Sequence, residues 1–179
     1  MLYVVDEVSG VTHLDNVMYV VCRWSSTIRL YNTDTQSPLS VINVDGMEDP
    51  QDVVVCRDDR QLYIAELFCI WRVSADDQSY VKLLTTKPFL CYSLSLTSRR
   101  LLVTSWPAPR LRQYNTADRQ LLREVSMPRY VRSVRHSAET TRGTLVVGHH
   151  GTPDDEIRNA VSELFSFVTQ LSTRYTAAR

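Results

Sequence analysis

Short, mainly apolar segments recur along the chain at a nearly constant spacing. Residues 18–21, 62–65, 101–104 and 144–147 occupy the same phase of a repeated pattern, and their second residues lie 44, 39 and 43 positions apart. In each repeat, turn residues precede this segment, and a polar loop and a strand of alternating apolar and polar residues follow it. Repeats of about 40 to 50 strand-forming residues are typical of propeller blades. The pattern therefore predicts a β-propeller.

The repeats also predict the organisation of the blades. Four strands fit into the first three repeats, which is the number of strands in a propeller blade. No stretch of helical periodicity long enough for a βαβ fold lies between them. We expect an all-β chain with about four blades of four antiparallel strands, the last blade being incomplete. The expected boundaries are residues 1–168 for the propeller, with blades at about 11–44, 47–85, 89–127 and 129–168, and residues 169–179 for a C-terminal tail.

The end of the chain is ambiguous in pattern. Apolar residues within 157–171 fall at helical spacing, whereas the phase of the repeats calls for a strand at 160–165. We expect the strand, with a helical end from about Phe167 as the alternative. A missing last strand indicates a truncated product or a partial propeller, unless residues 2–5 complete the fourth blade in a closed ring.

Composition narrows the class of protein. Hydrophobic residues make up 44% and charged residues 22% of the chain, and no window approaches the roughly 20 apolar residues of a transmembrane helix. No basic and apolar leader is visible at the start, so we expect a cytoplasmic protein with no membrane partner, unless the true beginning of the protein is missing. Each of the four cysteines lies in or beside a predicted strand without a CxxC pair, which favours buried free thiols. They are Cys22, Cys56, Cys69 and Cys91.

The sequence gives little support for catalysis or for a metal site. No GxSxG motif is present, and His13 and His136 appear at equivalent places in first strands, which favours a structural role. The loop from His149 to Glu156 concentrates histidines and acids but lacks a metal-binding spacing, so we expect a solvated loop. We therefore predict no catalytic residue, no metal, no cofactor and no small-molecule substrate.

The second repeat resembles an NHL repeat. The residues that carry the resemblance are 50–55, with a proline before an apolar strand, then 59–66 and 70–73, and the whole chain, especially 139–147, is similar to NHL-like propeller proteins of invertebrates. The resemblance implies a binding scaffold for a protein or RNA partner, often found at the end of tripartite-motif ubiquitin ligases, and usually six blades. No RING, B-box or coiled coil accompanies it here, and four repeats would then be part of a six-bladed ring.

Some six-bladed propellers are hydrolases or lactonases with a calcium ion held in the central channel. Asp52 is a candidate channel acid in this chain, but the residues at the matching positions, Tyr92 and Arg132, are not calcium ligands. An enzyme of this kind is the least favoured hypothesis.

Two binding hypotheses remain. Residues 99–142 carry ten arginines and only three acidic residues, an arrangement suited to RNA. A protein partner, our first expectation, would instead use exposed aromatic loop residues, with Trp106 as the foremost candidate. The candidate binding residues are Trp106, Arg110, Arg112, Tyr114, Arg129, Tyr130, Arg132 and Arg135.

Overall fold

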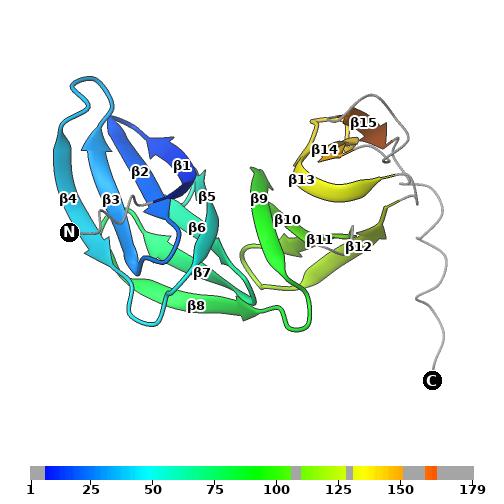
Figure 1. Ribbon diagram of the computed structural model, residues 1–179, viewed down its shortest axis with the longest axis horizontal. Helices are drawn as coiled ribbons and strands as arrows, with labels where there is room; N and C mark the ends of the chain where they lie inside the picture. The colour runs from blue at the N-terminus through cyan, green and yellow to red at the C-terminus, as the bar shows by residue number, and fades with distance from the viewer. Residues whose placement is uncertain (1–6, 106–109, 128–130, 151–159, 165–179) are drawn as a thin grey trace.

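The structure of the chain is a computed structural model that describes residues 7–105, 110–127, 131–150 and 160–164. Every regular element in these residues is a β-strand, and the strands form four antiparallel sheets in chain order (Figure 1). The first sheet contains β1 (Val8–Leu14), β2 (Val17–Cys22), β3 (Thr27–Asn32) and β4 (Pro38–Asn43), and the second contains β5 (Pro50–Cys56), β6 (Gln61–Glu66), β7 (Cys69–Ser74) and β8 (Tyr80–Thr85). The third contains β9 (Cys91–Thr97), β10 (Arg100–Ser105), β11 (Arg110–Asn115) and β12 (Leu121–Ser126), and the fourth contains β13 (Arg132–Glu139), β14 (Leu145–His150) and β15 (Ala160–Leu164).

The sheets follow one another around an arc, with the first sheet at one end and the fourth at the other (Figure 1). The first strand of each sheet lies beside the first strand of the next, so that β1, β5, β9 and β13 line the inner side. We call these four the inner strands. This arrangement confirms the predicted all-β propeller of about four blades, and the fourth sheet has three strands within the described residues. The six-bladed ring implied by the resemblance stays a prediction.

The hydrophobic pattern follows from the stacking of the sheets. In β6, Tyr63 and Ile64 point to opposite faces, yet both are fully buried, because one sheet covers each face of the second sheet. The outer strand β12 shows the contrast, since Leu121 and Leu122 at its start are both exposed. The second strands of the sheets are therefore apolar on both faces, which explains why they stand out in the sequence as uninterrupted apolar segments.

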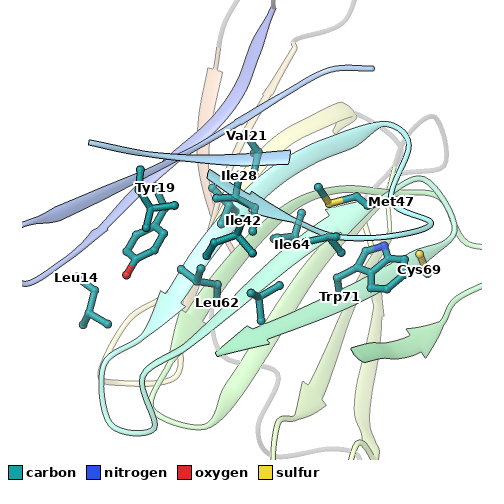
Figure 2. Packing of buried hydrophobic residues seen from close by; sticks show 14 residues of the cluster. Leu14, Tyr19, Val21, Ile28, Ile42, Met47, Leu62, Ile64, Cys69 and Trp71 are labelled. Carbon is teal, nitrogen blue, oxygen red and sulfur yellow. The ribbon is translucent and has the colours of Figure 1, made fainter. Parts of the chain in front are cut away.

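Three apolar clusters join consecutive sheets. Between the first two sheets, Tyr19 and Val21 of β2 face Leu62 and Ile64 of β6, with Trp71 beside them (Figure 2). The second cluster joins the second and third sheets, and the third joins the third and fourth. Each sheet thus depends on its neighbour for burial of its apolar face, as in other repeat proteins.

The hairpin registers define which positions of the inner strands are equivalent. Gly10, Asp52 and Ser93 each pair with the fourth residue of the apolar segment in the following strand, Val21, Ala65 and Thr104. In the fourth sheet the apolar segment is shifted by one residue to 145–148, and His136 pairs with its last residue, Gly148. The equivalent inner positions are therefore Gly10, Asp52, Ser93 and His136.

This register corrects two sequence interpretations. His13 pairs with Met18, the first residue of its apolar segment, so His13 and His136 lie three positions apart and are not equivalent. Tyr92 and Arg132 likewise do not match Asp52. Bulges near the start of β5, β9 and β13 and hairpins of unequal length add residues that counting along the sequence cannot place.

The ends of the chain and the thiols complete the comparison with the sequence. Residues 160–164 form a strand paired with β14, as the repeat phase predicts, while the alternative helical end, the tail and residues 2–5 lie outside the described residues. All four cysteines are buried free thiols, as expected. The described residues contain no helix with the length and hydropathy needed to cross a bilayer.

Candidate functional site

All four inner strands start at the same end of the sheets. The connections between sheets also lie there, together with the loops that join the second and third strands of each sheet. We call this end the linker rim. Within the described residues it includes the β2–β3 loop (23–26), the β4–β5 connection (44–49), the β6–β7 loop (67–68) and the β8–β9 connection (86–90).

A polar pocket of about 330 Å³ opens on the inner strands at this rim. Every inner strand contributes to its wall, including the equivalent positions Asp52, Ser93 and His136. The lining consists of Glu7, Val8, Ser9, Arg23, Gln51, Asp52, Tyr92, Ser93, Arg135 and His136. The pocket therefore marks the central channel of the propeller arc.

Asp52 is the acid of the channel and serves as a link between sheets. Its two carboxylate oxygens accept hydrogen bonds from the backbone N–H of Val53 and of Leu94, each at 2.8 Å. Burial raises the pKa of Asp52, and these two hydrogen bonds and the nearby His136 oppose that rise. Both oxygens are thus engaged with backbone, which leaves Asp52 poorly placed to hold a metal ion.

The neighbouring inner strands are joined by side chains about 43 residues apart. The Ser93 hydroxyl and Nδ1 of His136 lie 3.1 Å apart, and the Arg135 guanidinium donates to the Tyr92 hydroxyl at 2.6 Å while lying over its ring. These contacts connect β9 with β13 across the pocket. In the residues described, no group of three or more His, Cys, Asp or Glu side chains is placed to hold a metal ion.

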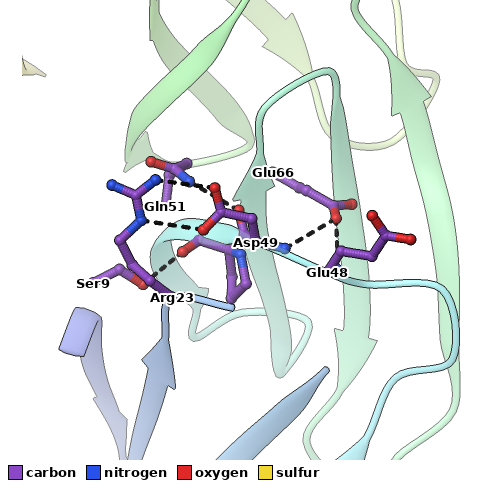
Figure 3. Close-up of polar contacts among 7 residues, drawn as sticks. Ser9, Arg23, Glu48, Asp49, Gln51 and Glu66 are labelled. Atoms are coloured by element: carbon purple, nitrogen blue, oxygen red, sulfur yellow. Dashed lines mark hydrogen bonds and ion pairs between the residues drawn. The ribbon is translucent and has the colours of Figure 1, made fainter. Parts of the chain in front are cut away.

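A network of charged side chains, in which Asp49 is buried, fixes the β4–β5 connection on the rim (Figure 3). Arg23 donates to both carboxylate oxygens of Asp49, at 3.1 and 3.0 Å, and Glu66 accepts from the backbone N–H of Glu48 at 2.7 Å. Glu66 also accepts from the Trp71 indole at 2.7 Å. Burial raises the pKa of Glu66, but these donors and the Cys69 thiol outweigh it, so that the net shift is downward.

Two aromatic side chains project from this ordered rim. Trp24, in the β2–β3 loop, is 72% exposed, and Phe68, in the β6–β7 loop, is 38% exposed. The Arg23 guanidinium lies 5.0 Å from the centre of the Trp24 ring, and the Lys87 ammonium lies 5.4 Å from that of Phe68. Phe68 borders a second hollow of about 480 Å³, which Lys87 also lines.

Sequence reasoning missed Trp24 and Phe68, although a signal for them exists. Each follows the second strand of its sheet by two residues, and Trp106 follows β10 directly at the corresponding connection. The chain thus has an aromatic residue in each of these three connections. Trp106 itself lies outside the described residues, as do Arg129 and Tyr130.

The other predicted binding residues lie in different parts of the third and fourth sheets. Arg110 and Arg112 share Glu124 of β12 as an ionic partner, at 3.5 and 2.6 Å, and Arg112 also lies over the ring of Phe89. Tyr114 is buried in the cluster between the second and third sheets. Arg135 lines the channel pocket, and the side chain of Arg132 is outside the described part of the structure.

Comparisons with known proteins support the fold alone. No family pattern matches the chain, and no curated protein matches its sequence. Among solved structures, hydrazine synthase from Kuenenia stuttgartiensis superposes with a TM-score of 0.73 at 13% identity, over 92% of this chain and 47% of that one. The WD40 repeats of RRP9 superpose with a TM-score of 0.68 at 12% identity, over 82% of this chain and 46% of that one.

Two further structures are informative about length. U3-55K has a TM-score of 0.68 at 12% identity over 88% of this chain and 52% of its own, whereas the designed protein Ika4 has a TM-score of 0.65 at 11% identity over 88% of this chain and 91% of its own. The chain therefore spans about half of hydrazine synthase, RRP9 and U3-55K. These structures include WD40 propellers, and they identify the fold of this chain as a propeller arc of four sheets.

Proposed function

We propose that this chain is a non-enzymatic β-propeller scaffold that binds a protein partner at its linker rim. The observation that carries the proposal is the pair of exposed aromatic side chains, Trp24 and Phe68, on two loops of that rim. Aromatic residues dominate the binding energy of protein interfaces because they bury a large area with few rotatable bonds. The two side chains offer such anchors on neighbouring blades.

The local structure of Trp24 supports this role. Its backbone adopts φ of 60°, a left-handed conformation that costs a non-glycine residue of the order of 1 kcal/mol or more. The surrounding network, with Arg23 paired to Asp49, holds the loop next to this residue. A bulky side chain kept exposed on a strained backbone favours a binding function over a packing function.

The NHL resemblance of the second sheet points in the same direction. Residues 50–55, 59–66 and 70–73, which carry it, correspond closely to β5, β6 and β7. Propellers of that family serve as scaffolds for protein or RNA, which agrees with the propeller neighbours of this chain. We therefore propose an NHL-type interaction module.

A protein partner is favoured over RNA by the pairing of the arginines. Arg110 and Arg112 contact Glu124, and Arg123 donates to the buried Glu139 at 2.6 Å. An arginine already paired with a carboxylate gives up that interaction when it binds phosphate, so its gain in affinity is small. Four of the ten arginines in residues 99–142 are thus paired with carboxylates within the fold, namely Arg100, Arg110, Arg112 and Arg123.

The channel is also better suited to structure than to catalysis. Of the equivalent inner positions, only Asp52 is an acid, and its oxygens accept backbone hydrogen bonds. The ring of carboxylates expected in a calcium-dependent hydrolase or lactonase is not formed by Gly10, Ser93 and His136. This supports a scaffold rather than an enzyme.

The test is capture of a partner from ribonuclease-treated extract by the immobilised protein. The amount of partner captured should fall at least several-fold when the immobilised protein carries Trp24→Ala or Phe68→Ala. Tyr80→Ala is the matched control, because Tyr80 is 37% exposed but lies at the start of the outer strand β8. Equal loss of capture in all three variants would contradict the proposal. A partner captured only from untreated extract, and not after ribonuclease treatment, would also contradict it.

A further inference from the structure

Each end of the arc has one sheet face that packs on no other sheet of the chain in the three internal stacks. In every internal stack, one face of a sheet, here called its back face, packs on the front face of the sheet before it in the chain. In the second sheet, for example, the back face includes Val53 and Leu62, which pack against the first sheet. The first sheet has a back face of its own, and the fourth sheet has a front face, and neither belongs to these three stacks.

The back face of the first sheet carries apolar side chains that are incompletely covered, beside the polar side chains of His13 and Arg29. By the hairpin registers, Val11 is equivalent to Val53, yet Val11 is 53% exposed and Val53 only 2%. Met18 is half-buried where its equivalent, Leu62, is fully buried. Terminal repeats of stacked proteins normally carry a polar outer face, since nothing covers them. The exposed Val11 therefore leaves apolar surface on this face that a further sheet would cover.

The front face of the fourth sheet shows the same incompleteness. Val146 of β14 occupies the position of Tyr63 in β6 and Leu102 in β10, both of which are fully buried between sheets. Val146 itself is only half-buried, while its neighbours Leu145 and Val147 point into the cluster with the third sheet. Val11 and Val146 are thus apolar side chains left partly exposed on the two faces that no internal stack uses.

We propose that the back face of the first sheet docks on the front face of the fourth sheet of a second copy of this chain, so that two copies close one ring of eight sheets. A second copy fits because it supplies the type of front face that every internal stack uses. The contact is heterologous, and a twofold rotation repeats it to close the ring without leaving an open end. Propellers of up to about eight blades are common, and one copy spans only 46% and 52% of the RRP9 and U3-55K propeller chains.

Sedimentation velocity across a concentration series tests the proposal directly. The wild-type chain should approach twice its mass of 20.6 kDa as its concentration rises. Val11→Asp on the back face and Val146→Asp on the front face should each weaken self-association at least tenfold. Leu121→Asp is the matched control, because Leu121 is 49% exposed, comparable with Val11, but lies on the outer strand of the third sheet.

The pair of variants separates this ring from other assemblies. A dimer through two first sheets would be sensitive to Val11→Asp and not to Val146→Asp, which would overturn the proposal. A wild-type chain that stays at 20.6 kDa at every concentration, or that forms species larger than two copies, would overturn it as well. Circular dichroism and thermal unfolding verify that each variant is folded, so that loss of association is assigned to the faces and not to misfolding.

Discussion

The guanidinium of Arg23 donates two hydrogen bonds to the carboxylate of Asp49, at 3.1 and 3.0 Å, and thereby links the β2–β3 loop to the connection between the first two sheets. The side chain of Asp49 is only 8% exposed. A buried carboxylate that loses its cation retains the full cost of its desolvation. This pair therefore holds the β2–β3 loop against the β4–β5 connection at the linker rim.

We expect Arg23→Ala to lower the free energy of unfolding by about 2 kcal/mol, the usual effect of removing a hydrogen bond to a charged group. Urea denaturation at neutral pH measures the change. Arg60→Ala is the control, because Arg60 bridges Asp15 and Asp76 at 2.7 Å on a solvent-exposed surface, where ion pairs contribute little. A loss for Arg60→Ala as large as that for Arg23→Ala would contradict this assignment.

Asp52 gives the stability of the protein a pH dependence with a defined sign. Because the pKa of Asp52 is raised in the folded protein, mainly by burial, the folded state binds its proton more tightly than the unfolded state does. The stabilisation of the folded state by protonated Asp52 is complete below pH 3.8, the ordinary pKa of an aspartate. It is lost as pH rises through the raised pKa of the folded protein. Wild type should therefore lose stability relative to Asp52→Asn as pH increases through this range.

Paired denaturation curves of wild type and Asp52→Asn at a series of pH values isolate this effect, since all other groups titrate in both proteins. The difference in unfolding free energy should become constant at neutral pH. A difference that does not vary with pH, or that favours wild type more strongly as pH rises, would show that burial does not dominate the titration of Asp52.

The sequence predicted the fold because burial on both faces leaves a repeated mark. Tyr63 and Ile64 are apolar neighbours in a strand, and such a pair is required only where sheets cover both faces. The spacing of these strands then predicted the number of sheets. The strand at Ala160–Leu164 was predicted from the same phase, against a competing helical periodicity.

The site was less accessible to sequence reasoning because it depends on register and on loops. The bulges of β13 place His136, rather than Arg132, at the position of Asp52 in the channel, and no residue type announces a bulge of this kind. The exposure of Trp24 follows from a left-handed backbone and from the position of the loop outside the stack. Sequence reasoning singled out Trp106 instead, from its place in the loop 106–109 between two predicted strands.

The buried thiols should be chemically inert in the native protein. Burial, with the nearby Glu66 carboxylate, raises the pKa of Cys69 to about 12, and burial raises that of Cys91 to about 11. The thiolate is the reactive form, and it is scarce at neutral pH when the pKa is this high. A thiol reagent at pH 7 should label neither residue in the native protein and should label both after denaturation, as mass spectrometry of digests will show. Rapid labelling of native Cys69 or Cys91 would contradict the packing described for them.

The first two inner strands approach each other so closely at Gly10 that a larger residue there is destabilising. A Cβ atom at this position would lie 2.8 Å from the backbone nitrogen of Val53 and 3.0 Å from Cα of Asp52, so that β1 and β5 would have to separate. Overpacking of this kind costs about 1 to 3 kcal/mol, and we expect Gly10→Ala to lower the unfolding free energy by that amount.

Gly148→Ala is the matched control within a strand, because the nearest atom to its added Cβ, the His136 carbonyl oxygen, is 3.7 Å away, an ordinary contact. Urea denaturation of the two variants should therefore give a clear loss for Gly10→Ala and a much smaller change for Gly148→Ala, and equal losses would mean that the strand contact between the first two sheets is not as close as described.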